Sequence, residues 1–189
     1  MPARALPCSL ACLLMSIAAA LGCGSSEPSD ELDPGVVDEL ASNQGSASGS
    51  GWTGSYTSSF TTTSCDCPTL EVQGQSLDLC SLVEQAPTSI ELSQAEGFLV
   101  VVLATDMSPS DAMLTGAIEA DASFVVAGHR NASTLLGSVE LLARIDGTLE
   151  SIEGQAKLQG SAGQRLIAEF ANEPIDCRWL GTLEGTRVE

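Results

Sequence analysis

Basic side chains are scarce in this sequence. Seven Lys and Arg residues stand against 25 Asp and Glu residues, and the formal net charge is −18. Phosphate backbones repel such a surface, so the charge excludes a nucleic-acid-binding protein. Anionic lipid headgroups repel it too, which excludes attachment to a membrane through a basic face. The acidity itself indicates a surface that resists self-association and does not point to a particular ligand.

Catalytic motifs are also missing. The sequence has no Gly-x-Ser-x-Gly elbow, no His-Glu-x-x-His zinc motif and no phosphate-binding loop. Its one histidine, His129, follows a predicted strand, and we expect it in a surface loop. Residues 65–67, Cys-Asp-Cys, are a candidate metal motif that lacks a second close pair of ligands. The sequence therefore predicts neither an enzyme nor a protein that depends on a cofactor or a metal.

The first 22 residues carry one positive charge, Arg4, followed from Ala5 by about fifteen uncharged, mostly apolar residues. An apolar core that ends in small residues predicts an export signal that is removed from the mature protein. A retained membrane helix needs about 20 apolar residues, and Pro7 and Gly22 lie near the two ends of this core. Simple secretion and a retained anchor are the alternatives to a lipid-modified signal.

Residues 20–23, Ala-Leu-Gly-Cys, resemble the end of a bacterial lipoprotein signal peptide. This resemblance implies that residues 1–22 are the signal peptide and that Cys23 carries the lipid anchor. No aspartate follows Cys23 directly, which resembles sorting to the outer membrane, on either its periplasmic or its surface face. Residues 23–50 are rich in Ser, Gly and acidic side chains, so we predict a flexible linker after the lipidated cysteine.

Four cysteines remain after Cys23, and four cysteines in an oxidising compartment predict two disulfides. Cys65 and Cys67 are two residues apart, so a bond between them would be strained. We therefore predict that one of this pair joins Cys80 and that the other joins Cys177.

Residues 51–189 alternate in the manner of β-strands. Residues 52–63 place aromatic side chains on one face and hydroxyl side chains on the other. Residues 135–145 could line a helix, but they pair well with residues 148–158 across Asp146-Gly147, a typical two-residue hairpin turn. A second turn is predicted at residues 160–163. About eight short antiparallel strands result, which predicts an all-β barrel with up-and-down strand order or, alternatively, a β-sandwich.

The opening segment Gly54-Ser55-Tyr56-Thr57 and the closing segment from Trp179 to Arg187 resemble those of small calycin-like, lipocalin-like barrels found behind bacterial lipoprotein signals. The resemblance implies that Arg187 stacks over Trp52. It also implies that the first and last strands are neighbours, so that a disulfide to Cys177 would tie them together.

These observations predict a membrane-anchored, non-catalytic interaction or structural module with a protein partner. The alternative is a carrier of a small apolar ligand, because inward-facing small residues such as Gly54, Ala156 and Gly181 could leave room inside the barrel. The candidate ligand-facing side chains of such a carrier are Trp52, Tyr56, Phe60 and Trp179.

Overall fold

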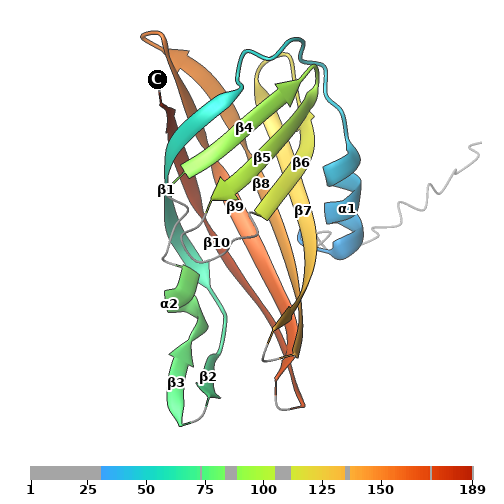
Figure 1. Ribbon diagram of the computed structural model, residues 1–189, viewed down its shortest axis with the longest axis vertical. Helices are drawn as coiled ribbons and strands as arrows, with labels where there is room; N and C mark the ends of the chain where they lie inside the picture. The colour runs from blue at the N-terminus through green and yellow to red at the C-terminus, as the bar shows by residue number, and fades with distance from the viewer. Residues whose placement is uncertain are drawn as a thin grey trace, which may run out of the picture.

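Eight antiparallel strands form a closed ring in the computed structural model of the chain (Figure 1). The order around the ring is β1-β10-β9-β8-β7-β6-β5-β4, so each strand lies beside its neighbour in sequence and β1 closes the ring. The prediction of an all-β, up-and-down barrel is confirmed, and the two separate sheets of a sandwich are not formed. The structure describes residues 31–72, 74–83, 89–104, 112–134, 137–170 and 172–188.

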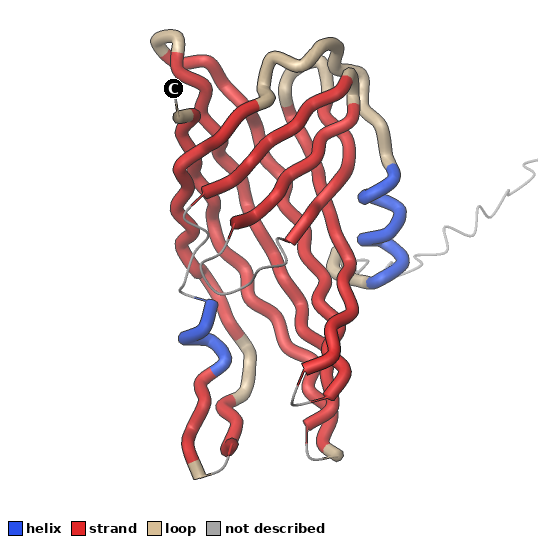
Figure 2. The backbone as a smooth tube through the Cα atoms, viewed as in Figure 1, coloured by secondary structure: helices blue, strands red, loops and turns tan. Residues whose placement is uncertain are grey.

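The strands of the ring differ in length. β4, β5 and β6 have seven residues each, whereas β7 to β10 have 12 to 16, so the long strands continue beyond the short ones at one end (Figure 2). A separate two-stranded hairpin, β2–β3, and the short helix α2 lie at that end, between β1 and β4 in sequence. We call it the hairpin end. The ring strands are β1 Gly54–Cys65, β4 Ser89–Ala95, β5 Phe98–Ala104, β6 Ala112–Ile118, β7 Ser123–Thr134, β8 Gly137–Ile152, β9 Gln155–Phe170 and β10 Glu173–Arg187, and the insertion comprises β2 Thr69–Val72, β3 Gln75–Asp78 and α2 Leu79–Val83.

Alternate residues of each strand face the inside of the ring, where they form the main core. Because successive side chains of a strand point to opposite faces, this core draws on every second position of all eight ring strands. It fills the barrel away from the hairpin end. Its largest fully buried members include Tyr56, Ile90, Leu99, Leu114, Ile118, Leu158 and Leu183.

The β8–β9 hairpin turns seven residues later than the sequence predicts. Its turn is at Glu153 and Gly154, which have φ angles of 54° and 85° and lie between the paired residues Ile152 and Gln155. The predicted turn at Asp146-Gly147 is wrong, because Gly147 lies inside β8 and pairs with Gly160 of β9. A Cβ atom at Gly147 would collide with the carbonyl oxygen of Gln159, so this glycine allows close strand approach and does not mark a turn.

The same correction applies to the predicted turn at residues 160–163, which lie within β9. The helical alternative is overturned for residues 137–145, which belong to β8, and residues 135–136 lie outside the described part of the chain. The prediction of a strand is confirmed for residues 137–145, but the predicted pairing between the two strands is wrong. Ile145 pairs with Ala162, and the hairpin is therefore much longer than predicted.

Residues 31–50, part of the predicted flexible linker, form a helix and a segment that hydrogen-bonds to the barrel, so the prediction is wrong for these residues. Helix α1, Pro34–Ser42, begins after Asp33, whose side chain accepts a hydrogen bond of 2.9 Å from the amide of Gly35. The fully buried side chain of Val37 packs with Ala127 and Leu142 on the outer face of β7 and β8. Leu40 and Ile167 pack against the same cluster, and the hydroxyl of Thr115 in β6 donates to the carbonyl of Ala41 at 2.7 Å, so apolar and polar contacts together attach the helix to the outside of the sheet. Neither helix in the described ranges has the length and apolar character of a membrane span.

Residues 43–53 then run across one end of the barrel to reach β1, and we call them the strap (Figure 1). The amide of Gly45 donates to the carbonyl of Gly97 at 2.9 Å, and the amide of Ala47 donates to the carbonyl of Ile118 at 3.1 Å. The carbonyl of Gly49 accepts a hydrogen bond of 3.0 Å from the amide of Glu96. The strap therefore provides hydrogen-bond partners for backbone groups at the strand ends. We call the end of the barrel that it crosses the strap end.

Two disulfides join the insertion to the barrel, as predicted. Cys65 bonds to Cys80, and Cys67 bonds to Cys177 in β10. The second bond bridges the seam where β1 meets β10, since Cys65 lies opposite Trp179 in that ladder. Around it a second core, buried at Ile175, Cys177 and Trp179, fills the hairpin end.

The two disulfides should contribute unequally to stability. Cys67–Cys177 closes a loop of 110 residues, whereas Cys65–Cys80 closes one of 15. Loop-closure entropy favours the longer cross-link by about 1–2 kcal/mol. We therefore expect the double variant Cys67→Ala/Cys177→Ala to lose more free energy of unfolding in urea than Cys65→Ala/Cys80→Ala. Equal losses, or the opposite order, would contradict the role of the longer bond in holding the seam.

Candidate functional site

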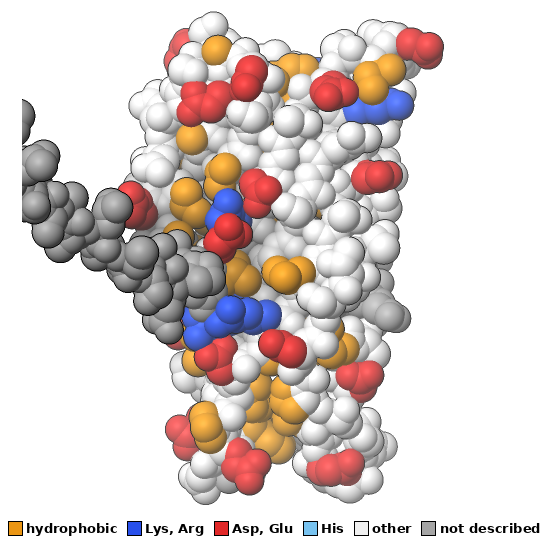
Figure 3. Space-filling view, turned by 180° about the vertical axis from the view of Figure 1, so that it is seen from behind, with side chains coloured by type: hydrophobic (Ala, Val, Ile, Leu, Met, Phe, Trp, Pro, Cys, Tyr) orange, Lys and Arg blue, Asp and Glu red, His pale blue; other side chains and the backbone are white. Residues whose placement is uncertain are grey.

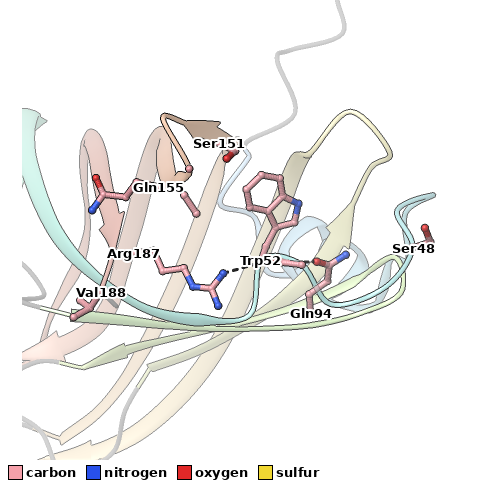
Figure 4. Close-up of a pocket in the computed structure, with 10 residues that line it drawn as sticks. Ser48, Trp52, Gln94, Ser151, Gln155, Arg187 and Val188 are labelled. Atoms are coloured by element: carbon pink, nitrogen blue, oxygen red, sulfur yellow. Dashed lines mark hydrogen bonds between the residues drawn. The ribbon is translucent and has the colours of Figure 1, made fainter.

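A pocket with a volume of about 640 Å³ opens at the strap end (Figure 4). Three parts of the chain contribute its main polar and aromatic groups. Trp52 comes from the strap, Gln94 from β4, and Arg187 from the end of β10. Ser151 and Gln155 of the β8–β9 hairpin form the opposite wall. The pocket is thus built where strands that are distant in sequence end together.

Two side chains hold Trp52 in place through hydrogen bonds to its backbone. Its amide donates a hydrogen bond of 3.2 Å to Oε1 of Gln94, and its carbonyl accepts one of 3.0 Å from the hydroxyl of Tyr56. The half-buried indole packs against the main core and stands at the opening (Figure 4). These contacts fix an aromatic surface at the edge of the pocket.

The side chain of Gln94 forms part of the pocket wall and is fixed there by hydrogen bonds. Its side chain is 5% exposed, the one polar residue among the buried described residues. Besides accepting from Trp52, it donates through Nε2 to the carbonyl of Glu96 at 3.1 Å. Both ends of the amide are therefore paired, as a buried polar group requires.

Arg187 lies across Gly54, whose φ is 152°. That φ favours glycine, and a Cβ atom there would lie 2.7 Å from the arginine Nε, so a larger residue would also require the guanidinium to move. Nη1 of Arg187 donates to the carbonyl of Gly51 at 3.3 Å. Arg187 and Trp52, which the sequence resemblance brings together, thus line the same pocket.

The electrostatics of this end involve Tyr56 as well. Burial raises the pKa of the Tyr56 hydroxyl above its ordinary value, and the positive charge of Arg187 partly opposes that shift. Tyr56 therefore remains a neutral hydrogen-bond donor to the Trp52 carbonyl.

Of the four predicted ligand-facing side chains, Trp52 lines the described pocket. Tyr56 is fully buried in the main core, and Trp179 is buried in the second core. Phe60 contacts both cores, and its ring occupies the space that a Cβ atom at Gly181 would take. The small inward-facing residue at 181 therefore accommodates a neighbouring ring and does not leave a cavity.

Trp179 has one unusual feature. Its side chain is 7% exposed, yet its indole nitrogen Nε1 has no hydrogen-bond partner among the residues that the structure describes. A buried donor without an acceptor is costly, by about 1–3 kcal/mol. A polar atom of a bound molecule could satisfy it.

His129 lies within β7 and not in the predicted surface loop. Its Nδ1 is 3.3 Å from Oδ1 of Asp38 in α1, and its Nε2 is 2.8 Å from Oε1 of Glu140 in β8. The imidazole thus connects the N-terminal helix to the outer face of the sheet. Among the described His, Cys, Asp and Glu side chains, no group of three could hold a metal ion.

Basic side chains on the outer face of the sheet are paired with carboxylates. Nη1 of Arg144 is 3.1 Å from Oε2 of Glu31, and Arg165 donates through Nε and Nη2 to both oxygens of Asp176, at 2.7 and 2.6 Å. Figure 3 shows acidic side chains spread over this outer surface with few basic ones between them. The few arginines here therefore connect neighbouring strands, or the N-terminal segment, to the sheet.

Comparisons with family models, with curated proteins and with solved structures find no match to this chain. The calycin-like resemblance therefore stays a prediction. Cys23, the predicted lipid-bearing residue, lies outside the described residues. Gln94 was not predicted as a site residue, although it follows the inward-facing apolar residues Ile90 and Leu92 at the same spacing in β4. Arg187 was predicted beside Trp52 but was not named as a ligand-binding residue.

The Arg165–Asp176 pair should make stability depend on pH. Hydrogen bonding from Arg165 lowers the pKa of Asp176 below its ordinary value of about 4. The stabilisation is therefore fully present above that ordinary value and is lost as the pH falls through the lower folded-state pKa. The pair is partly exposed, so Asp176→Asn should cost less than about 1 kcal/mol of unfolding free energy at pH 7.

This difference from wild type should shrink as the pH falls from about 6 to about 3, in urea titrations followed by circular dichroism. Glu184→Gln removes the same charge from an exposed position of the same strand and serves as the control. A loss in Asp176→Asn that stays constant with pH, or an equal loss in the control, would show that the ion pair is not responsible.

Proposed function

We propose that this protein is a non-catalytic interaction or structural module that a lipid on Cys23 anchors in the cell envelope, with the outer membrane as its site. The lipoprotein-like residues 20–23 motivate the anchor. The two disulfides support an oxidising compartment, since disulfides persist outside the cytoplasm. Its partner would be another component of the envelope.

The observation that carries this proposal is a contact with the barrel made by a residue close to Cys23 in sequence. Glu31 follows Cys23 by eight residues, and its carboxylate already contacts Arg144 on the barrel. Eight residues span at most about 29 Å when fully extended. A lipid on Cys23 would therefore hold the barrel close to the bilayer, where a long linker would let it move away.

The contacts of His129 and the kinds of polar side chain in the pocket support a non-catalytic role. His129 is engaged between Asp38 and Glu140, and the main core fills the barrel with apolar side chains. The described pocket contains an arginine, amides and hydroxyls, which suit binding better than proton transfer.

A second candidate function is the carrier of a small apolar ligand. The buried indole N–H of Trp179 at the hairpin end favours it, because a ligand carbonyl or hydroxyl could accept that hydrogen bond. Co-purification of a lipid in native mass spectrometry would support this candidate over a module that acts only through its surface.

Substitution of Cys23 tests the anchor directly. Two or more acyl chains contribute about 0.8 kcal/mol for each buried methylene, so we expect the wild-type protein in the membrane fraction with the added mass of a lipid. Cys23→Ser should appear in the soluble fraction with an unchanged circular dichroism spectrum. Cys12→Ser, which alters a cysteine of the predicted signal peptide, is the matched control and should remain lipid-anchored.

Membrane association of Cys23→Ser equal to that of wild type would contradict the proposal. So would a wild-type intact mass that equals the unmodified chain.

A further inference from the structure

We propose that the strap-end pocket binds a small molecule that carries a carboxylate beside a planar apolar group. This site is separate from the lipid anchor, and the inference does not depend on the anchor. Its volume of about 640 Å³ lies within the range of small-molecule sites in proteins.

The charge of the pocket differs from that of the rest of the molecule. The chain has 25 acidic and seven basic residues, yet none of the ten residues that line the pocket is acidic and one of them is an arginine. Two glutamates at this end are turned to the strap instead. Oε2 of Glu119 accepts from the amide of Ser46 at 3.0 Å, and Oε2 of Glu96 accepts from the amide of Gly49 at 3.3 Å. The pocket is thus an exception in an anionic surface.

Arg187 supplies the positive charge. Arg144 and Arg165 each contact a carboxylate of the protein, but no carboxylate lies within ion-pair distance of Arg187 among the residues that the structure describes. Its Nη1 donates to the backbone carbonyl of Gly51, which is neutral and does not balance the charge of the guanidinium. A guanidinium binds a carboxylate through two parallel N–H···O hydrogen bonds, and a ligand carboxylate would provide the missing counter-charge.

Trp52 supplies the surface for the apolar group. Gln94 and Tyr56 hold its backbone from two sides, so the indole is fixed before a ligand arrives. Figure 4 shows the indole and Arg187 on one side of the opening and Ser151 and Gln155 on the other. A flat ring that stacks on the indole could thus place its carboxylate toward the guanidinium while the hydroxyl and amide groups bind its edge.

A pair of isosteric probes tests this site. We would titrate the full chain, purified in a non-ionic detergent, with 2-naphthoate and with 2-naphthamide, and follow the two indole N–H signals by NMR. We expect 2-naphthoate to bind saturably and to shift the Trp52 signal. The neutral amide should bind at least tenfold more weakly, because it lacks the negative charge that pairs with the guanidinium of Arg187.

Substitution of Arg187 identifies the group that binds the charge. Arg187→Gln should weaken 2-naphthoate binding at least tenfold, and Lys157→Gln should leave it unchanged, although both remove one positive charge. Lys157 lies outside this pocket, on the outer face of β9, and is therefore the matched control.

Equal affinities for the two probes would overturn the proposal on the wild-type protein alone, even if Arg187→Gln fails to fold. A shift confined to the Trp179 signal would also overturn it and would place binding in the second core. Neither result would bear on the lipid anchor, which the Cys23 variant tests separately.

Discussion

Closure of the sheet is the constraint on which the rest of this structure depends. β1 pairs with β4 on one side and with β10 on the other. Without the β1–β10 pairing, these two strands would be the open edges of the sheet, with unpaired backbone groups. Only in the closed ring do the alternate residues of all eight strands face one enclosed core. The Cys67–Cys177 bond crosses this same seam. Arg187 and Trp52 lie at its strap end, so the pocket forms as a consequence of closure.

The N-terminal segment, residues 31–53, packs on the closed barrel and contributes to its pocket. Val37 packs on the outer face of β7 and β8, the strap bonds to strand ends at Gly97 and Ile118, and Trp52 then enters the pocket wall. A segment that would otherwise separate the domain from its proposed anchor therefore forms part of both the fold and the site. If the lipid lies on Cys23, the distance between membrane and barrel follows from this packing.

The sequence predicted the elements whose side chains alternate without ambiguity. It also reduced the disulfide pairings to two, because Cys65 and Cys67 are too close in sequence to bond to each other, but it did not decide between those two. It failed where a local motif competed with long-range pairing. Asp146-Gly147 is typical of a hairpin turn, but the β7 and β9 ladders extend β8 through it to Glu153-Gly154. The packing of α1 on the sheet could not be predicted, because the residues that Val37 and Leu40 contact lie far away in the sequence, in β7, β8 and β9. The resemblance places Arg187 beside Trp52, but the contribution of Gln94 and of the β8–β9 hairpin to the pocket could not be predicted, because these parts of the chain meet Trp52 only after closure.

The central claim is that the N-terminal segment belongs to the folded barrel, and amide hydrogen exchange on the full chain tests it most directly. The amides of Gly45 and Ala47 donate to barrel carbonyls, and that of Val37 in α1 donates to the carbonyl of Asp33, the N-cap of the helix. We expect these amides to exchange far more slowly than in an unstructured peptide, with protection close to that of β6. Exchange of all three at the rate of an unstructured chain, beside a protected β6, would contradict the account.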